Sequence, residues 1–309
     1  PIFMLRSAPI LMIMGLILLT LVLFYGSSGG GAQRWLDLGI VRFQPSELMK
    51  IIVPMTIAAI LSQKTLPPRP LPIITSLIAI GLVTILIARQ PDLGTSLLIA
   101  ASGVYVLFFS GVRVMLVRNR WLNLSILSSM IIGSLFFAWN YLLISYQQRR
   151  ILTLFNPESD PLGSGYHIIQ SKIAIGSGGF TGKGITKGSQ SQLDFVPEQS
   201  TDFIFSVLAE ELGFLGFLLL IIIYSLIIYR CLVLSLKCED NFSRLLGSSL
   251  TVVFFTYIFV NIGMVSGLLP VVGVPLPFVS YGGSSLITLM ASFGIIMSIH
   301  KHKSPRYLQ

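Results

Sequence analysis

The feature that most constrains this chain is a series of long, nearly uncharged apolar runs. A helix needs about 20 apolar residues to cross the ~30 Å hydrocarbon core of a bilayer, or about 17 at the short end. The candidate runs cover residues 9–25, 47–62, 71–88, 95–111, 121–144, 213–229, 245–268 and 284–299. They are continuously apolar and do not alternate, which argues against a membrane β-barrel. The sequence therefore predicts an all-α, polytopic membrane protein with about eight transmembrane helices.

The composition supports lipid as the solvent of this chain. Only 11% of the residues are charged and 53% are hydrophobic, with a mean hydropathy of +0.83. Soluble domains average about 25% charged residues. We therefore expect one membrane domain over residues 1–309 and not two soluble ones. The net charge of +9 is better explained by loop charges that orient helices than by binding to nucleic acid.

The distribution of Lys and Arg predicts the orientation of the helices. If the first run leaves the cytoplasm, twelve of these residues fall in cytoplasmic segments and four in the short outer segments. Cytoplasmic loops carry the excess of Lys and Arg in membrane proteins. The sequence therefore predicts a cytoplasmic C-terminus. The two cysteines, Cys231 and Cys238, lack metal-ligand spacing and are interpreted as free thiols.

Residues 145–202 form one long segment between predicted spans. Loops of this length are usually functional or disordered and rarely serve only as connections. Apolar side chains recur through it, which argues against disorder. We interpret it as a folded loop on the non-cytoplasmic side that dips into the membrane. An interfacial helix near 201–212 is expected to follow it, before Gly213 and the next span.

Polar residues cluster at the outer ends of the predicted spans. Taken one at a time, Glu47 and Asp92 each follow a proline and fit the first turn of a helix, and Asp202 could likewise be an N-terminal cap. Taken together they need another explanation, because an ionisable group costs ~2.5–3.5 kcal/mol at the centre of a membrane helix.

The spacing of these residues predicts ion pairs. Glu47 and Lys50 are three residues apart on one helix face and can pair, and Asp92 can pair with Arg34 or Arg89. Arginines 149 and 150 form a further cationic cluster. Convergence of carboxylates and cations on one side of the bundle indicates an outward-facing cavity for an anionic substrate.

No cofactor is identified from the sequence. His167, His300 and His302 do not form a metal-binding set, and the glycine-rich stretch 176–184 lacks the spacing and the Ser/Thr of a phosphate loop. A divalent cation at Asp202 or Asp92 stays an open alternative.

Five longer stretches of sequence closely resemble the SEDS family (shape, elongation, division, sporulation) of bacterial cell-wall proteins. They are GAQRWLDLGIVRFQPSE at 31–47, QPDLGTS at 90–96, NPESDPLGSGYHIIQSKIAIGSGG at 156–179, FVPEQSTDFIFSVLAEELG at 195–213 and GMVSGLLPVVGVPLPFVSYGGSS at 263–285. The resemblance implies ten transmembrane helices with both termini cytoplasmic. Since eight are visible and no signal peptide precedes them, we expect the first two helices to be missing.

The resemblance also implies an activity and its residues. Family members are peptidoglycan glycosyltransferases of the bacterial cytoplasmic (inner) membrane, which polymerise lipid II during cell elongation by inverting transfer and release undecaprenyl pyrophosphate. They work with a class B penicillin-binding protein. The implied catalytic aspartate falls on Asp202, and the implied substrate-binding residues are Arg34, Glu47, Lys50, Asp92 and Arg150. Ser200 departs from the family pattern, in which His is frequent.

Two alternatives from other functional classes stay open at this point. A lipid II flippase would use similar helices, although the ionisable groups here crowd the outer ends and no inverted repeats of broken helices are visible. A non-catalytic scaffold for the penicillin-binding protein would tolerate single substitutions in the cavity. If Asp202 acts as a general base, two effects on its pKa oppose each other. A helix N-terminus lowers the pKa of a carboxylate, whereas dehydration raises it.

Overall fold

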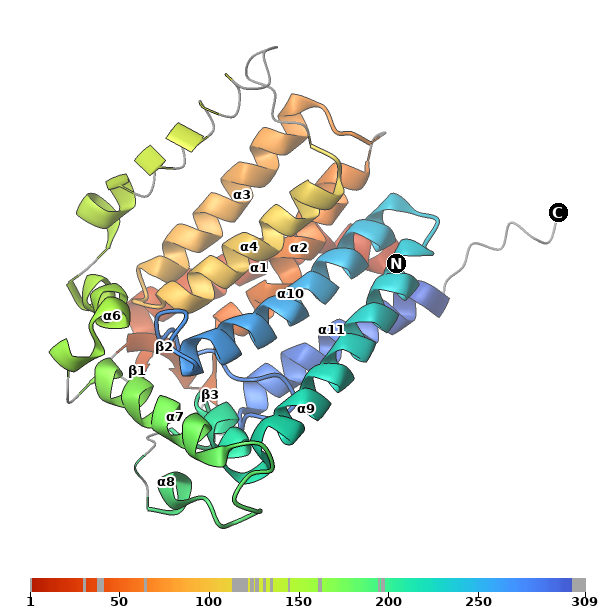
Figure 1. Ribbon diagram of the computed structural model, residues 1–309. Coiled ribbons are helices and arrows are strands. Elements are labelled where there is room, and N and C mark those ends of the chain that lie inside the picture. The colour runs from red at the N-terminus through yellow and green to blue at the C-terminus, as the bar shows by residue number, and fades with distance from the viewer. Residues whose placement is uncertain are drawn as a thin grey trace.

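The computed structural model describes most of the chain. The described residues are 2–29, 32–37, 42–63, 66–112, 122, 125, 128–129, 132–133, 136–143, 145–160, 163–193, 195 and 198–301. Within them, long helices lie side by side as a bundle, and the shorter elements gather at one end (Figure 1). The start of the first helix and the end of the last one lie at the other end.

The long helices begin and end close to the predicted spans. They are α1 (Ile2–Tyr25), α2 (Pro45–Ser62), α3 (Pro70–Ala88), α4 (Leu93–Phe109), α9 (Ile204–Leu236), α10 (Asn241–Val265) and α11 (Gly283–Lys301). Of these, six are long and apolar enough to cross a membrane, and α4 is a shorter apolar helix. The predicted span 121–144 is described only in part, and its longest described stretch, residues 136–143, contains the π-helical turn Ala138–Leu142. The prediction of a polytopic helical membrane protein is confirmed.

Local sequence explains where the helices of the site begin. Pro45 occupies the first turn of α2, where its missing N–H is not needed. Asp92 is the N-cap of α4, and its Oδ1 accepts a hydrogen bond from the backbone N–H of Thr95 at 3.2 Å. Both helices therefore start at the end of the bundle where the short elements lie.

Helices α2 and α10 form the centre of the bundle. α10 contacts α2, α4, α9 and α11, and α2 also packs against α1 and α3. Small residues in α10 let its neighbours approach closely, as is typical of membrane helices. Ser249, for example, is fully buried and donates a hydrogen bond to the carbonyl of Ser102 in α4 at 2.9 Å. The outer helices α1, α3, α9 and α11 instead expose apolar side chains.

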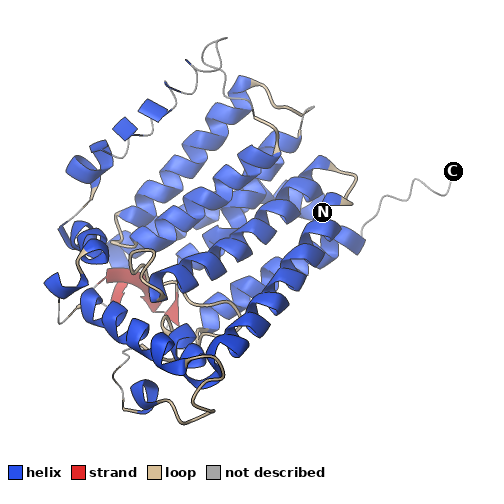
Figure 2. Cartoon of the chain, viewed as in Figure 1, coloured by secondary structure: helices blue, strands red, loops and turns tan. Residues whose placement is uncertain are grey.

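A small antiparallel sheet connects α1 to α2, which the all-α prediction did not include. Its strands are β1 (Ser27–Gly29), β2 (Ala32–Asp37) and β3 (Arg42–Phe43), drawn in red in Figure 2. Strands of two to six residues are too short to produce a periodic sequence pattern, so only their pairing reveals them.

Segment 145–202 is folded, as predicted. It contains α6 (Ser145–Phe155), the 3₁₀ turn η2 (Pro157–Ser159), α7 (Ser164–Gly178) and α8 (Ser189–Gln192). α7 packs against α9 and α10 and also touches α6 (Figure 1). The segment therefore covers the end of the bundle instead of extending away from it.

The predicted interfacial helix is the first part of α9. A kink at Gly213, with φ +62°, separates it from the rest of α9. A Cβ at Gly213 would lie 2.3 Å from the backbone nitrogen of Gly182, so only glycine fits. Backbone hydrogen bonds join the loop to this helix, including Lys183 N–H to the Glu210 carbonyl at 3.0 Å. The kink thus fixes the loop to the helix that follows Asp202.

Candidate active site

Asp202 lies at the covered end of the bundle, two residues before α9 begins. The N-cap of α9 is Phe203 and no side chain caps the helix, so the alternative that Asp202 is a cap is wrong. Asp202 borders a cavity of about 390 Å³ between α6, α7, the start of α9 and the loop before α11. The cavity is lined by Arg149, Arg150, Asp160, Gly163, His167, Glu198, Asp202, Phe203, Val271 and Gly273.

The environment of Asp202 prepares it to accept a proton. Burial, reinforced by the Glu198 carboxylate, raises the pKa of Asp202 to about 6, and the cations Arg150 and Arg34 only partly oppose this. Burial therefore shifts the pKa of Asp202 in the direction that a general base requires. A carboxylate with a pKa near 6 is ionised at neutral pH and is still a useful general base.

Arg34, Asp92 and Arg150 surround a smaller cavity next to the first. Arg34 lies on β2, and its Nε is 3.6 Å from Asp92 Oδ2, which confirms the predicted pairing of these two residues. Arg34 Nη2 also donates a hydrogen bond to the Pro91 carbonyl at 2.9 Å. Arg150 Nη1 donates to the Val271 carbonyl at 3.0 Å. Because Arg150 lines both cavities, these three residues and Asp202 form one continuous polar site.

Glu47 and Lys50 form a second group inside the bundle. Lys50 Nζ donates a hydrogen bond to Glu47 Oε1, as their spacing predicts. Thr288 of α11 donates to the other carboxylate oxygen at 3.2 Å, and the Lys50 ammonium lies 4.8 Å from the centre of the Tyr257 ring. Both charged side chains are almost fully buried. The pair is therefore held by three helices.

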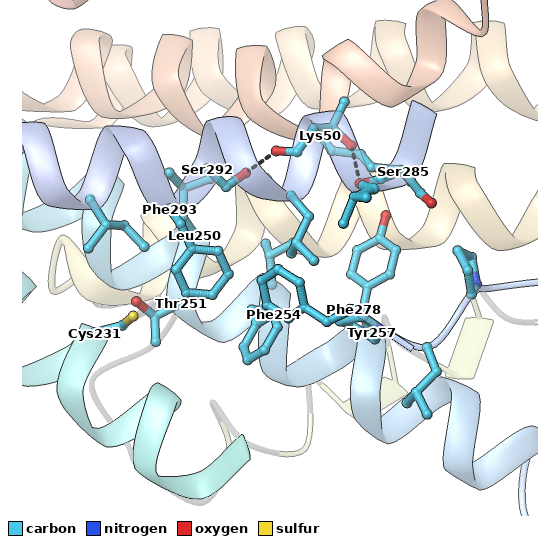
Figure 3. Close-up of a pocket in the computed structure, with 18 of the residues that line it drawn as sticks. Lys50, Cys231, Leu250, Thr251, Phe254, Tyr257, Phe278, Ser285, Ser292 and Phe293 are labelled. Carbon is cyan, nitrogen blue, oxygen red and sulfur yellow. Dashed lines mark hydrogen bonds between the residues drawn. The ribbon is translucent and has the colours of Figure 1, made fainter. Parts of the chain in front are cut away.

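Lys50 borders a narrow, mostly apolar cavity of about 60 Å³ between α2, α9, α10 and α11. Figure 3 shows Lys50, Tyr257 and Ser285 toward one end of this cavity and Cys231 at the other, with the Phe254 ring between them. The six residues singled out from the sequence thus lie in two groups. Gln44 connects the groups, because its amide donates to Ser46 at the start of α2 and to Asp92 at 3.4 Å.

Sequence reasoning passed over several side chains of the site. His167 stacks on Phe203 with ring centres 5.4 Å apart, and burial lowers the pKa of His167, so it is largely neutral at pH 7. Tyr257 and Thr288 meet the Glu47–Lys50 pair from α10 and α11. Each is a single polar residue in an apolar helix, which is a weak signal until the helices are packed together.

The described residues do not suggest a preformed metal centre. Among them, no three His, Cys, Asp or Glu side chains come close enough together to hold an ion. Both cysteines are free thiols, as predicted, and Cys231 is buried in the bundle.

Comparison with known proteins places the chain in a family. The profile of the cell cycle protein family FtsW/RodA/SpoVE matches residues 1–305. The chain is 53% identical over 296 residues to the peptidoglycan glycosyltransferase MrdB of Escherichia coli K12, covering 96% of this chain and 78% of that protein. It is 34% identical to stage V sporulation protein E of Bacillus subtilis, covering 95% and 78% respectively.

Solved structures share the fold. A chain from a study of how a peptidoglycan synthase complex coordinates polymerization and crosslinking matches with a TM-score of 0.80 and 31% identity, covering 99% of this chain and 83% of that one. The rod shape determining protein RodA of Thermus thermophilus matches with a TM-score of 0.67 and 27% identity, over 97% and 80% of the two chains. The family profile, the sequence relatives and the fold agree, and the chain belongs to the FtsW/RodA/SpoVE family of cell cycle proteins.

Proposed function

We propose that this chain polymerises lipid II into glycan strands, with Asp202 as the general base of an inverting glycosyl transfer. Its activity class is peptidoglycan glycosyltransferase, that of its relative at 53% identity. The observation that carries the base assignment is the position of Asp202. Its carboxyl group borders a polar cavity, is partly dehydrated and has no hydrogen-bond or ion-pair partner among the described residues.

The proposed reaction balances with groups at this site. The growing strand, linked to undecaprenyl pyrophosphate, is the donor, and the 4-hydroxyl of lipid II is the acceptor. Asp202 takes the hydroxyl proton while the acceptor oxygen bonds to the anomeric carbon of the donor. The bond from that carbon to the pyrophosphate breaks, and its electron pair leaves with the pyrophosphate. One base suffices for inversion, because no covalent intermediate is formed.

The arginines are suited to the leaving group. Pyrophosphate gains negative charge as its bond to the sugar breaks, and fixed cations nearby stabilise that charge. Arg34 and Arg150 both line the smaller cavity and donate hydrogen bonds to the carbonyls of Pro91 and Val271. We assign them to the pyrophosphate, with Asp92 holding Arg34 in place. Glu47 and Lys50 are assigned to the inner part of the substrate site.

We also propose the setting of the reaction. The distribution of Lys and Arg supports an orientation in which the covered end of the bundle faces the extracytoplasmic side and the C-terminus is cytoplasmic. The undecaprenyl chains of both substrates are anchored in the same membrane. The structural relative that belongs to a peptidoglycan synthase complex supports a class B penicillin-binding protein as the partner.

The experiment is polymerisation of purified lipid II by the full-length protein with its penicillin-binding partner, in lipid nanodiscs. Wild type is expected to make strands, and Asp202→Asn, which keeps the size but loses the base, is expected to make none. Glu239→Gln is the matched control, since Glu239 is an exposed carboxylate at the opposite end of the bundle. Full polymerisation by Asp202→Asn would show that another group is the base.

Two further arms separate the alternatives. Addition of EDTA tests for a divalent cation, and strand synthesis is expected to persist in its presence. A reconstituted wild-type complex that makes no strands but moves lipid II between leaflets would favour the flippase. A complex that does neither, and tolerates Asp202→Asn in cells, would favour the scaffold.

A further inference from the structure

Asn261 is a fully buried amide near the C-terminal end of the apolar helix α10. Its Nδ2 donates two hydrogen bonds, one to the backbone carbonyl of Asp202 at 2.9 Å and one to that of Val274 at 2.6 Å. Its Oδ1 is enclosed and has no partner among the described residues. The opposite amide orientation would place an oxygen against two carbonyl oxygens, so the hydrogen-bond network fixes the orientation.

The two carbonyls belong to the two sides of the site. Asp202 is the proposed base. Val274 belongs to the stretch 270–276 before α11, which has no regular secondary structure and whose Val271 carbonyl accepts the hydrogen bond from Arg150. In the same stretch, a Cβ at Gly273 would lie 3.2 Å from Asp202 Oδ2. A single amide therefore connects the base to the backbone that holds a cation of the leaving-group site.

A second set of hydrogen bonds joins the same two segments. Ser280 Oγ donates to the Thr201 carbonyl at 2.5 Å and accepts from the Leu276 N–H at 2.7 Å. The Tyr281 N–H donates to the Ser200 carbonyl at 2.9 Å. Hydrogen bonds from Asn261 and from Ser280 thus connect the backbone around Asp202 to the stretch before α11.

The unpaired oxygen distinguishes Asn261 from ordinary polar contacts between helices. A polar group buried without a partner is costly, and polar residues retained inside membrane helices usually have a function. Among uncharged side chains, the amides of Asn and Gln offer two N–H groups from one nitrogen. An apolar residue of similar size would leave the carbonyls of Asp202 and Val274 without a donor.

We propose that Asn261 is a positioning residue for glycosyl transfer, which sets the Asp202 carboxylate against the stretch 270–276 and through it against Arg150. The inference rests on the proposed role of Asp202 and extends it to the helix behind the site. Asn261 does not touch the substrate. It acts by holding the backbone on which the base and the Arg150 contact are built.

The test compares Asn261→Leu, Asp202→Ala and wild type in lipid II polymerisation by the full-length protein with its partner. A displacement of catalytic groups by about 1 Å costs about 100-fold in rate. We therefore expect the kcat of Asn261→Leu to fall about 10- to 100-fold, with KM for lipid II nearly unchanged. Ser249→Ala is the matched control, because it removes a buried hydrogen bond from the same helix far from the site.

A purely structural role predicts a different result. Loss of the two Asn261 hydrogen bonds should expose Asp202 to water and lower its pKa. The acid limb of the pH–rate profile should then move to lower pH. A residue that only stabilises the fold would leave that limb in place. The charged groups that act on Asp202 are Glu198, Arg150 and Arg34, and the other titratable or charged groups that line its cavity are Arg149, Asp160 and His167. None of them changes in the variant.

The outcomes are distinguishable. A kcat of Asn261→Leu within threefold of wild type, or a loss equal to that of Ser249→Ala, would overturn the inference. Strands made by Asp202→Ala would instead overturn the proposed function. If Asn261→Leu does not fold, Ser280→Ala removes the second tie between the same segments and is expected to lower kcat and move the acid limb in the same direction. An unchanged profile for Ser280→Ala would then reject the proposal.

Discussion

Removal of the Lys50 ammonium tests how the buried pair inside the bundle contributes to the protein. The side chains of Lys50 and Glu47 are 11% and 8% exposed. Substitution Lys50→Met keeps most of the side-chain volume but leaves the carboxylate of Glu47 with one neutral donor, Thr288. Loss of one partner of a buried ion pair typically costs about 3–5 kcal/mol of stability. The cation–π contact with Tyr257 adds about 0.5–2 kcal/mol.

A double-mutant cycle separates the pair from its surroundings. Lys50→Met and Glu47→Gln should each lower the free energy of unfolding by about 3–5 kcal/mol, because each strands one buried charge. The double variant should lose much less than the sum, since it buries no unpaired charge. The assay is reversible denaturation in mixed micelles, followed by helical circular dichroism.

The control is Lys187→Met, because Lys187 is exposed in the loop before α8 and its loss should change stability by no more than about 0.5 kcal/mol. A double variant that loses the full sum of the two single losses would refute the reasoning. Polymerisation by the same variants then separates two roles. A stable double variant that makes no strands indicates that the charged pair acts on the substrate, whereas an active one indicates a structural pair.

Two other predictions concern the base and the kink. The kcat/KM for lipid II should rise about tenfold per pH unit below pH 6 and level off above it, because Asp202 must be ionised to act as a base. Glu198→Gln should move this rise to lower pH, because it removes a carboxylate that raises the pKa of Asp202. A profile that stays flat from pH 5 to 8 would exclude a base of this pKa. Gly213→Ala should lower the free energy of unfolding by about 1–3 kcal/mol or more, because φ at Gly213 is +62° and Gly182 leaves no room for a Cβ. The control is Gly81→Ala in α3, whose Cβ would meet no atom within 4 Å and which should not destabilise the protein. Equal melting temperatures for these two variants would contradict the account of the kink.

The sequence predicted what depends on short spacings and on hydropathy. Most spans follow from the hydropathy of continuous apolar runs. Residues within one or two helical turns of each other predict the starts of α2 and α4 and the Glu47–Lys50 pair. The Arg34–Asp92 pair was one of the two pairings predicted for Asp92, from charge and from the shared outer ends of the spans, and Arg89 was the other candidate. These features need no knowledge of how the helices pack.

What could not be predicted depends on contacts between distant segments. The contact of Thr288 with Glu47 crosses 241 positions, and that of Asn261 with Asp202 crosses 59. Neither leaves a periodic signal, because each is a single polar residue in an apolar run. The division of the six predicted residues into two groups has the same origin, since Lys50 is turned toward α10 and α11 by packing.

Packing also distinguishes Glu47, Asp92 and Asp202, three carboxylates that the sequence places alike near the start of a predicted helix. Asp92 caps α4 and pairs with Arg34, and Glu47 lies in the first turn of α2 and pairs with Lys50. Both are stabilised where they are, with their lone pairs engaged by cations and donors. Asp202 precedes α9 without capping it, and among the described residues its carboxylate has no hydrogen-bond donor or ion-pair partner. Its open acceptor sites make Asp202 the best suited of the three to take a proton from a substrate, which supports the proposed role of Asp202 as the base.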